Sequence, residues 1–380
     1  MDLSLSSEQV QIQNLAKELA ENELAPRAAV VDRDALFPRD NVNKLAELGL
    51  LGLTIPGEFG GGRLDPLSVV LCLEQLSKAC PSTALVLGDH LDAASIMVAG
   101  GGDEAKSRLL PSMARGEKLG TVAISERGSG CNPFNVETAA KAVDDHYVVN
   151  GSKVFITSGE QAEVHFVAVR TNPEQPGPGG QSYLFVEKGN PGFSLGESYE
   201  RMGFRGVSPR ELVFEDCRVP KDNLVGGEGG YLGIQLMTGG SIVIGAAAVS
   251  LGIAQVAVEA SIKYAKERLQ VGKQPLTSYQ AVKFMLIEMS TAVDVARAMV
   301  YQAAAALSGG PGGPPVACFK AKLFASEMAL EVTDRALRVH GGTGYCRDLP
   351  IERYYRDARG MTLHGIPTEL LKDFIGMFML

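Results

Sequence analysis

The sequence predicts an α+β protein with a helical N-terminal domain, a β-barrel-like middle domain and a C-terminal four-helix bundle. Apolar residues recur at helical spacing up to about Lys118, alternate with a period of two from Thr121 to about Val225, and return to helical spacing from Tyr231. Helices followed by strands and then by helices are typical of α+β folds rather than of alternating βαβ units. The 380 residues suffice for two or three domains. We therefore expect domains at residues 1–118, 119–230 and 231–380.

The N-terminal domain is expected to be a set of helices. Serines before Glu8 can cap the first helix, and the acidic residue favours its first turn. Apolar stripes at helical spacing predict helices at residues 10–24, 39–51, 67–80 and 82–98, with a glycine-rich loop at 55–62. Polar residues at 89–92, among them Asp89 and Asp92, are expected to interrupt the last of these helices.

The middle domain begins with a predicted hairpin. Residues 147–157 alternate in polarity on both sides of Asn150-Gly151, and Asn-Gly is the strongest short-range hairpin signal. Further strands are predicted at 164–170, 182–188 and 211–215, with an exposed, proline-rich loop at 172–181.

The C-terminal part is predicted to hold three long helices and one short, charged helix. The long helices are expected near residues 240–268, 278–307 and 315–340, with a linker at 309–313 between the last two. Gly341-Gly342 should end the third, because glycine takes the left-handed conformation after a helix without strain. A charged helix is expected over 353–359, followed by a rigid loop at 363–367 that is poor in polar groups.

Composition narrows the possible partners. A net charge of −8 and a pI near 5.3 argue against nucleic acid. The six cysteines show neither metal-ligand spacing nor a disulfide framework, so we expect no metal and a reducing, cytoplasmic location. The first residues lack the pattern of a signal peptide. Residues 241–260 come nearest to a membrane span, but polar residues break them, so a buried helix is expected and no membrane partner.

Six tracts, in this order along the chain, resemble the acyl-CoA dehydrogenase family. They are residues 124–130, 150–157, 201–205, 214–220, 264–273 and 340–345. Each tract alone is weak, but their shared order is specific and covers nearly the whole chain. The resemblance implies helical, β and helical domains, usually in a tetramer, that bind FAD between the β domain, the bundle and a neighbouring subunit.

The resemblance also implies which residues hold FAD. Phe155 and Thr157 would sit at the reactive face of the flavin, with the Thr157 hydroxyl near N5. The remaining implied contacts fall into three groups along the chain: Ile124, Ser125, Gly130 and Cys131 along the flavin; Arg268, Gln270, Gln280, Arg338 and Gly342 at the adenine dinucleotide, some across a subunit interface; and Pro367 and Glu369. The chain departs from the family where Phe155 replaces a usual Trp, Cys131 a usual Ser and Arg338 a usual Gln.

The catalytic base of the family is the main departure. Most members carry a Glu in a Tyr-Glu-Gly-Thr loop, shortly after an Arg-Asp-Ala tract that here is residues 356–358. An ungapped count from this tract places Gly365 at the Glu position. Other members place the Glu at the start of the first C-terminal helix, where Ile242 stands here, and Val243 replaces its accompanying Arg. The resemblance therefore implies that neither usual base is present.

Three explanations remain open. In the first, Asp89, aided by Asp92, has taken over as base, because burial in an apolar pocket raises the pKa of a carboxyl group towards neutrality; the alternative is a pair of solvent-facing acids at a break in the helix. His364 is the second candidate, unless it only packs against the loop backbone. The third explanation is different chemistry, as in the desulfinases and flavin-dependent monooxygenases of this fold, or a flavin-free structural paralogue.

We therefore predict an FAD-containing acyl-CoA dehydrogenase that oxidises a thioester at the α,β or a vinylogous position. Loss of the Glu and the space at Gly365 favour a bulky or alicyclic acyl group, such as cyclohexane- or cyclohexene-carboxyl-CoA. An electron-transfer flavoprotein is the expected acceptor, and the protein is expected to be a homo-oligomer, most simply a tetramer.

Overall fold

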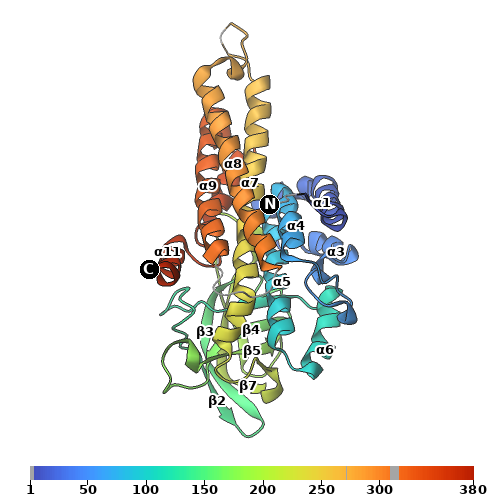
Figure 1. Ribbon diagram of the computed structural model, residues 1–380, viewed down its shortest axis with the longest axis vertical. Helices are drawn as coiled ribbons and strands as arrows, with labels where there is room; N and C mark the ends of the chain where they lie inside the picture. Colours follow the sequence, from blue (N-terminus) through green and yellow to red (C-terminus); the bar gives the residue numbers. More distant parts are fainter. Residues whose placement is uncertain (1–3, 271, 309–315) are drawn as a thin grey trace.

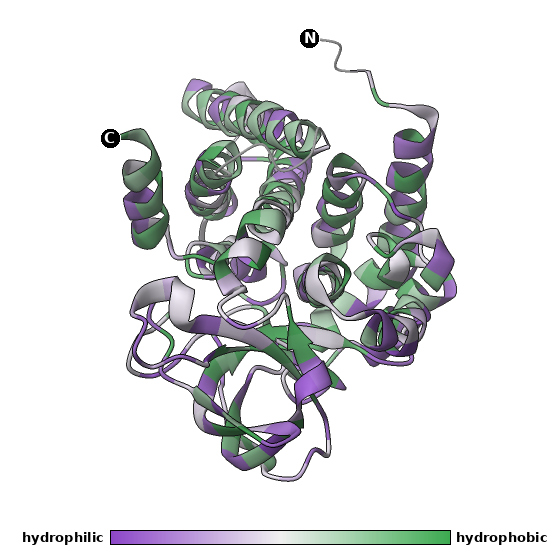
Figure 2. Ribbon diagram, turned by 60° about the horizontal axis from the view of Figure 1, so that its bottom comes forward, coloured by the Kyte–Doolittle hydropathy of each residue, from purple (hydrophilic) through white to green (hydrophobic). Residues whose placement is uncertain are grey.

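Two blocks of helices flank one mixed β-sheet, and the longest helix runs from the sheet through the whole C-terminal bundle (Figure 1). The computed structural model describes residues 4–270, 272–308 and 316–380. In the view of Figure 2 the sheet lies below both helical blocks, and hydrophobic residues run through each of the three parts. The predicted α+β class is confirmed.

The described part of the N-terminal block contains seven longer helical segments and two short 3-10 helices, η2 (Leu50–Gly52) and η3 (Gly57–Phe59). Ser6 caps the first as predicted: its hydroxyl accepts from the N–H of Gln9, whose side chain accepts in turn from the N–H of Ser6. The segments are α1 (Ser7–Leu19), the π-helix η1 (Ala20–Leu24), α2 (Ala25–Arg33), α3 (Arg39–Glu47), α4 (Pro66–Ala79), α5 (Pro81–Gly100) and α6 (Asp103–Ala114).

Helix α5 corrects one prediction. It continues without a break through residues 89–92, where an interruption was expected. Asp89 and Asp92 are three residues apart, so they lie on one face of the helix. That face borders a cavity rather than solvent, which removes the need for a break.

The β-sheet has the strand order β6-β7-β3-β2-β4-β5-β8, and β1 pairs in parallel with β4. The predicted strand at 164–170 is found unchanged, the one at 182–188 lies one residue earlier, and the one at 211–215 is longer. The strands are β1 (Gly120–Ala123), β2 (Ala139–Val143), β3 (His146–Ile156), β4 (Val164–Arg170), β5 (Gln181–Glu187), β6 (Phe193–Ser198), β7 (Arg210–Pro220) and β8 (Leu224–Val225).

The predicted hairpin at Asn150-Gly151 is wrong. Strand β3 runs straight through this pair, and its register with β7 shifts between Val149 and Gly151, which makes a β-bulge. Gly151 allows its backbone to pack closely against Thr138 and does not form a turn. A Cβ on Gly151 would lie 2.8 Å from atoms of Thr138. The hairpin in this part of the chain instead joins β2 to β3, before the Asn-Gly pair. Its turn contains Asp144, which has a φ of 44°.

The C-terminal block is built on α7. This helix begins at Tyr231, earlier than the predicted position near Gly240, while the other long helices end where they were predicted. Gly341 takes the expected left-handed conformation, with φ of 61°. The predicted linker at 309–313 lies outside the described residues. The helices are α7 (Tyr231–Glu267), α8 (Gln280–Leu307), α9 (Val316–His340), α10 (Ile351–Met361) and α11 (Thr368–Met379).

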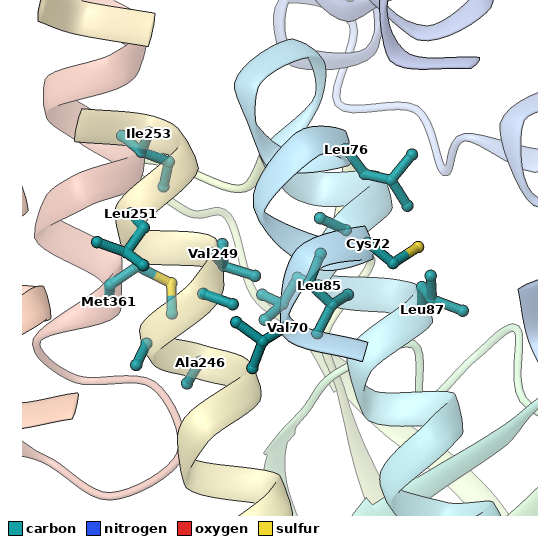
Figure 3. Close-up of a cluster of buried hydrophobic side chains, with 14 of the residues drawn as sticks. Val70, Cys72, Leu76, Leu85, Leu87, Ala246, Val249, Leu251, Ile253 and Met361 are labelled. Carbon is teal, nitrogen blue, oxygen red and sulfur yellow. The ribbon is translucent and has the colours of Figure 1, made fainter. Parts of the chain in front are cut away.

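The main hydrophobic core lies where α4 and α5 meet α7. Val70, Leu85 and Val249 point toward one another there, and Met361 of α10 closes the far side (Figure 3). Within the described residues, α7 is the one helix long and apolar enough to cross a membrane, but 78% of its most apolar window is buried inside the protein. This confirms the buried helix that was predicted because polar residues break the apolar run at 241–260.

The contact between α4 and α7 makes a testable prediction about stability. A Cβ on Gly252 would lie 2.3 Å from the carbonyl oxygen of Glu74, which cannot move without disturbing α4. Gly252→Ala should therefore lower the free energy of unfolding by about 2–3 kcal/mol, as overpacking does. Gly233→Ala, on the same helix with open space around it, should be neutral or stabilise by about 1 kcal/mol. Urea unfolding measures both, and equal effects would contradict this close packing.

Candidate active site

A cavity of about 810 Å³ opens where the sheet meets α5, the start of α7 and the loop after α10. We refer to it as the main cavity. It brings together residues that are far apart in the sequence, and most of those that the resemblance singled out line it: Asp89, Asp92, Ile124, Ser125, Cys131, Phe155, Thr157, His364 and Pro367.

One wall of the main cavity is held by a buried ion pair. The Nζ of Lys153 lies 2.6 Å from Oε1 of Glu126 and donates to the carbonyl of Ile124. The Glu126 carboxylate also accepts from the N–H groups of Glu137 and Thr138 and from the Thr138 hydroxyl. Burial lowers the pKa of Lys153 to about 8, against the attraction of Glu126. The loop that carries Ser125 and Cys131 is thereby fixed to strand β3.

The end of β3 carries two side chains into the same wall. Phe155 has φ of 57°, unusual for an aromatic residue, and its side chain is 64% exposed, with its ring centroid 4.3 Å from that of Tyr199. Such strained backbone is typical of functional sites. Thr157 is buried, and its hydroxyl makes no hydrogen bond to any described residue. Ser125 and Cys131 complete this wall, with Oγ and Sγ 3.1 Å apart.

The opposite wall carries two acids on α5. Burial raises the pKa of Asp89 to about 7, although the Thr121 hydroxyl and the Val122 N–H favour its ionised form. The Oδ2 atom of Asp89 is buried and has no hydrogen-bond partner among the described residues. Burial, and then the neighbouring Asp89, raise the pKa of Asp92 well above its usual value. Both carboxyl groups of the pair therefore hold a proton more readily than a carboxyl group in water does.

His364 is a weaker base than Asp89. Burial lowers its pKa to about 3, and the positive charges of Arg201 and Lys322 act in the same direction. The imidazole is therefore neutral at pH 7 and takes up a proton poorly. Lys322 also donates to the carbonyl of Ile366 at 2.7 Å, which fixes the loop that carries His364.

Gly365 leaves an open space beside these groups. No heavy atom lies within 4 Å of the position where its Cβ would stand, and its φ is 69°. Ile242 and Val243 of α7 line the main cavity nearby. Among the described residues that line the main cavity, three carry carboxyl groups: Asp89 and Asp92 on α5, and Glu200 in the loop after β6.

The other candidate FAD contacts lie elsewhere. Gly130 is next to the main cavity without lining it, with φ of 59°, and Glu369 is exposed in the first turn of α11. The remaining five are exposed at the end of the bundle remote from the sheet, where α7 ends, α8 begins and α9 ends (Figure 1): Arg268, Gln270, Gln280, Arg338 and Gly342. Along α7, Arg268 is about 38 Å from Val243 at 1.5 Å per residue.

Two cations of the site were missed by the sequence interpretation. Arg201 lines the main cavity and forms no ion pair within the described residues, and burial lowers its pKa. Lys322 is 1% exposed. A lysine inside the apolar face of a helix is rarely buried without a role, so its position in α9 was a usable signal. Arg201 stands in one of the six tracts, but no pattern indicated that it faces the cavity.

Family models match nearly the whole chain. The acyl-CoA dehydrogenase N-terminal, middle and C-terminal domains match residues 6–117, 121–217 and 243–380. The chain belongs to the acyl-CoA dehydrogenase family. It is an FAD-dependent oxidoreductase of acyl-CoA thioesters, as the resemblance implied.

Individual relatives agree along their full length. Acryloyl-CoA reductase (NADH) from Anaerotignum propionicum is 39% identical over 379 residues, which cover 99% of this chain and 95% of the relative. Butyryl-CoA dehydrogenase from Megasphaera elsdenii is 32% identical, with a TM-score of 0.95 and coverage of 100% and 99%. A chain in a structure of the electron transferring flavoprotein of Acidaminococcus fermentans is 36% identical, with a TM-score of 0.96 and full coverage of both chains.

The main cavity of this acyl-CoA dehydrogenase fits FAD. The exposed ring of Phe155 offers a flat apolar surface, and the free hydroxyl of Thr157 can hydrogen-bond a flavin edge. Ser125 and Cys131 add small polar groups on the same wall. The volume leaves room for a second group facing the two acids.

The ion pair that holds this wall gives the second prediction. Lys153→Met should leave Glu126 as a buried, uncompensated charge and lower the free energy of unfolding by about 3–5 kcal/mol. Lys141→Met removes an exposed lysine of β2 that forms no ion pair within the described residues, and should change little. Chemical unfolding and the fraction of protein that retains FAD are the two measurements. A Lys153 variant as stable as the Lys141 variant would rule out this role.

Proposed function

We propose that this enzyme dehydrogenates an acyl-CoA thioester with a bulky or alicyclic acyl group, and that Asp89 is its base. The proposal is supported above all by one arrangement: Asp89 and Asp92 border the same cavity as Thr157, while the space at Gly365 is open. A base must come within hydrogen-bond reach of the proton that it removes, on the face of the substrate opposite the hydride acceptor. Bound FAD supplies that acceptor.

The pKa values favour Asp89 over the other candidates. General bases work best when their pKa is near the working pH. Asp89, with a pKa of about 7, meets this condition. His364, at about 3, is too weak a base, and burial and the neighbouring Asp89 raise the pKa of Asp92 well above its usual value. In this proposal Asp92 is the partner acid of Asp89, in the way that two neighbouring carboxyl groups share one proton.

The size of the acyl group follows from a second, smaller space. An apolar side pocket of about 290 Å³ lies between α4, α5 and α7 and shares Asp89, Asp92 and His364 with the main cavity. Gly88 and Gly245 widen it, and Leu73 and Val249 close it. The two acids therefore stand where the main cavity enters this pocket. A compact ring of the cyclohexane or cyclohexene type suits such a short pocket, with the α or a vinylogous carbon beside Asp89.

The proposed function also implies an electron acceptor and a second copy of the chain. The relative from the Acidaminococcus fermentans structure supports an electron-transfer flavoprotein as acceptor. The exposed residues at the remote end of the bundle, such as Arg268 and Gln280, would then contact an FAD in another copy of the chain. This arrangement requires a homo-oligomer, most simply a tetramer.

Asp89→Asn should retain FAD but abolish bleaching, the loss of visible flavin absorbance on reduction by substrate. Anaerobic titration with straight, branched and alicyclic CoA esters measures this and identifies the acyl class. In the unaltered protein the bleaching rate should rise with pH through about 7, because Asp89 must be ionised to accept a proton. His364→Gln and the exposed control Asp40→Asn should still bleach. Full bleaching in Asp89→Asn would exclude the role of Asp89, and no bleaching by any thioester would favour desulfinase or monooxygenase chemistry.

Gly365→Glu tests the open space directly. No atom blocks a side chain there, although its left-handed backbone should cost about 1–2 kcal/mol of stability for a residue with a Cβ. In the Asp89→Asn background, this change should restore bleaching by straight-chain thioesters before alicyclic ones, because the new carboxyl group occupies the space of a bulky acyl group. Gly365→Gln adds the same volume without a base and is the matched control. Equal results for the two variants would show that a carboxylate at 365 cannot reach the substrate.

A further inference from the structure

We propose that Arg201, supported by Lys322, places positive charge beside bound FAD and so raises the reduction potential of this cofactor. The inference goes beyond the proposed function, because it depends neither on the base nor on the acyl group. It depends on the FAD that the family uses and on the fit of FAD to the main cavity.

The segment that carries Arg201 is fixed on both sides. Two residues before it, the ring centroid of Tyr199 lies 4.3 Å from that of Phe155, on the wall that fits FAD. One residue after it, the carbonyl oxygen of Met202 accepts from Nη1 of Arg356 at 2.8 Å. Arg201 is therefore held at the cavity wall close to Phe155, and not on a free loop.

The guanidinium group of Arg201 has no anion to balance it. It lines the main cavity, and it takes part in no ion pair with another described residue. The carboxylate of Asp357 attracts it, but Oδ1 of Asp357 already accepts from the N–H of Phe204. Burial lowers the pKa of Arg201, yet arginine keeps its charge at physiological pH. A charge removed from water is costly without a partner, so this site stabilises negative charge on a bound group.

Lys322 adds a second charge of this kind. It is 1% exposed, and its Nζ donates to the carbonyl oxygen of Ile366 at 2.7 Å. Ile366 lines the main cavity, and so does Phe319, which lies about one turn before Lys322 on α9. The ammonium group therefore stands behind the cavity wall. No carboxylate of the described chain forms an ion pair with it.

The other charges along the main cavity are balanced or open to solvent. Arg356 is paired with Asp32 and with Glu352. Arg359 and Glu200 are exposed, so water and salt screen them. On the opposite wall, burial raises the pKa values of the two acids of α5, which favours their uncharged form. Among the described residues, the two unpaired cations are therefore the main unbalanced charge at this cavity.

Reduction gives FAD the negative charge that these cations stabilise. Hydride transfer adds two electrons and one proton to the flavin, so FAD carries one more negative charge afterwards. A nearby cation stabilises this form more than the oxidised form, and charge close to the ring is one of the ways in which a protein tunes a flavin. Screening is weak at a partly buried site. Arg201 and Lys322 should therefore make bound FAD a stronger hydride acceptor.

Reductive titration of the FAD-loaded protein with an indicator dye, in the absence of substrate, tests the proposal. Arg201→Gln should weaken the binding of reduced FAD relative to oxidised FAD about tenfold, which lowers the potential by about 30 mV for a two-electron couple. Arg201→Lys keeps the charge and should restore most of the potential. Arg205→Gln is the matched control, because this guanidinium of the same segment donates to the backbone carbonyls of Asp32 and Arg33 outside the main cavity. Its potential should stay unchanged.

Lys322→Gln gives an independent second measurement. Its amide can still donate to the carbonyl of Ile366, so a lower potential reports the lost charge and not a displaced loop. An unchanged potential in Arg201→Gln would overturn the proposal, and so would equal falls in Arg201→Gln and Arg201→Lys, because the charge would then not be the cause. If Arg201→Gln does not retain FAD, Lys322→Gln and Lys322→Arg replace the two variants, with the same expected and contrary results. No thioester enters this titration, so its failure is distinct from failure of Asp89 as base, which the bleaching assay reports.

Discussion

The buried ion pair of Glu126 and Lys153 is the interaction on which the cavity depends. Two charges removed from water persist only when hydrogen bonds satisfy them, and here backbone N–H groups and one hydroxyl complete the carboxylate. The pair ties a loop to strand β3, so that Ser125 and Cys131 share one wall with Phe155 and Thr157. A backbone hydrogen bond from the Val154 N–H to the Ser125 carbonyl joins the same two segments.

On the opposite wall, burial changes the pKa values of three neighbouring side chains. Asp89, Asp92 and His364 all border one cavity, yet burial moves their pKa values in different directions, up for the acids and down for the imidazole. For His364, burial acts together with two nearby cations, and for Asp92 burial acts together with the neighbouring Asp89. Asp89 alone is left close to neutrality, with one oxygen free of partners. Within this wall, the environment of a residue rather than its type sets its pKa.

The periodicity of the apolar residues alone predicted the three-part architecture. The strand at 164–170 was predicted with the correct first and last residues, because its apolar run ends in loops on both sides. Two local predictions failed because tertiary contacts decided them. The Asn150-Gly151 pair makes a bulge since its glycine lies against Thr138, and α5 stays continuous since its acids face a cavity. The cavity residues were predicted from a resemblance in motif order, whereas the place of Arg201 depends on contacts between segments that no local pattern records.

The length of α7 separates the candidate cofactor residues into two sets. One set lines the main cavity at the start of the helix, and the other is exposed near its end, about 38 Å away along the helix axis. In the proposed homo-oligomer, the exposed set would contact a cofactor held mainly by a second copy of the chain. In that arrangement, each long helix would support its own cavity at one end and complete a neighbour's cofactor site at the other.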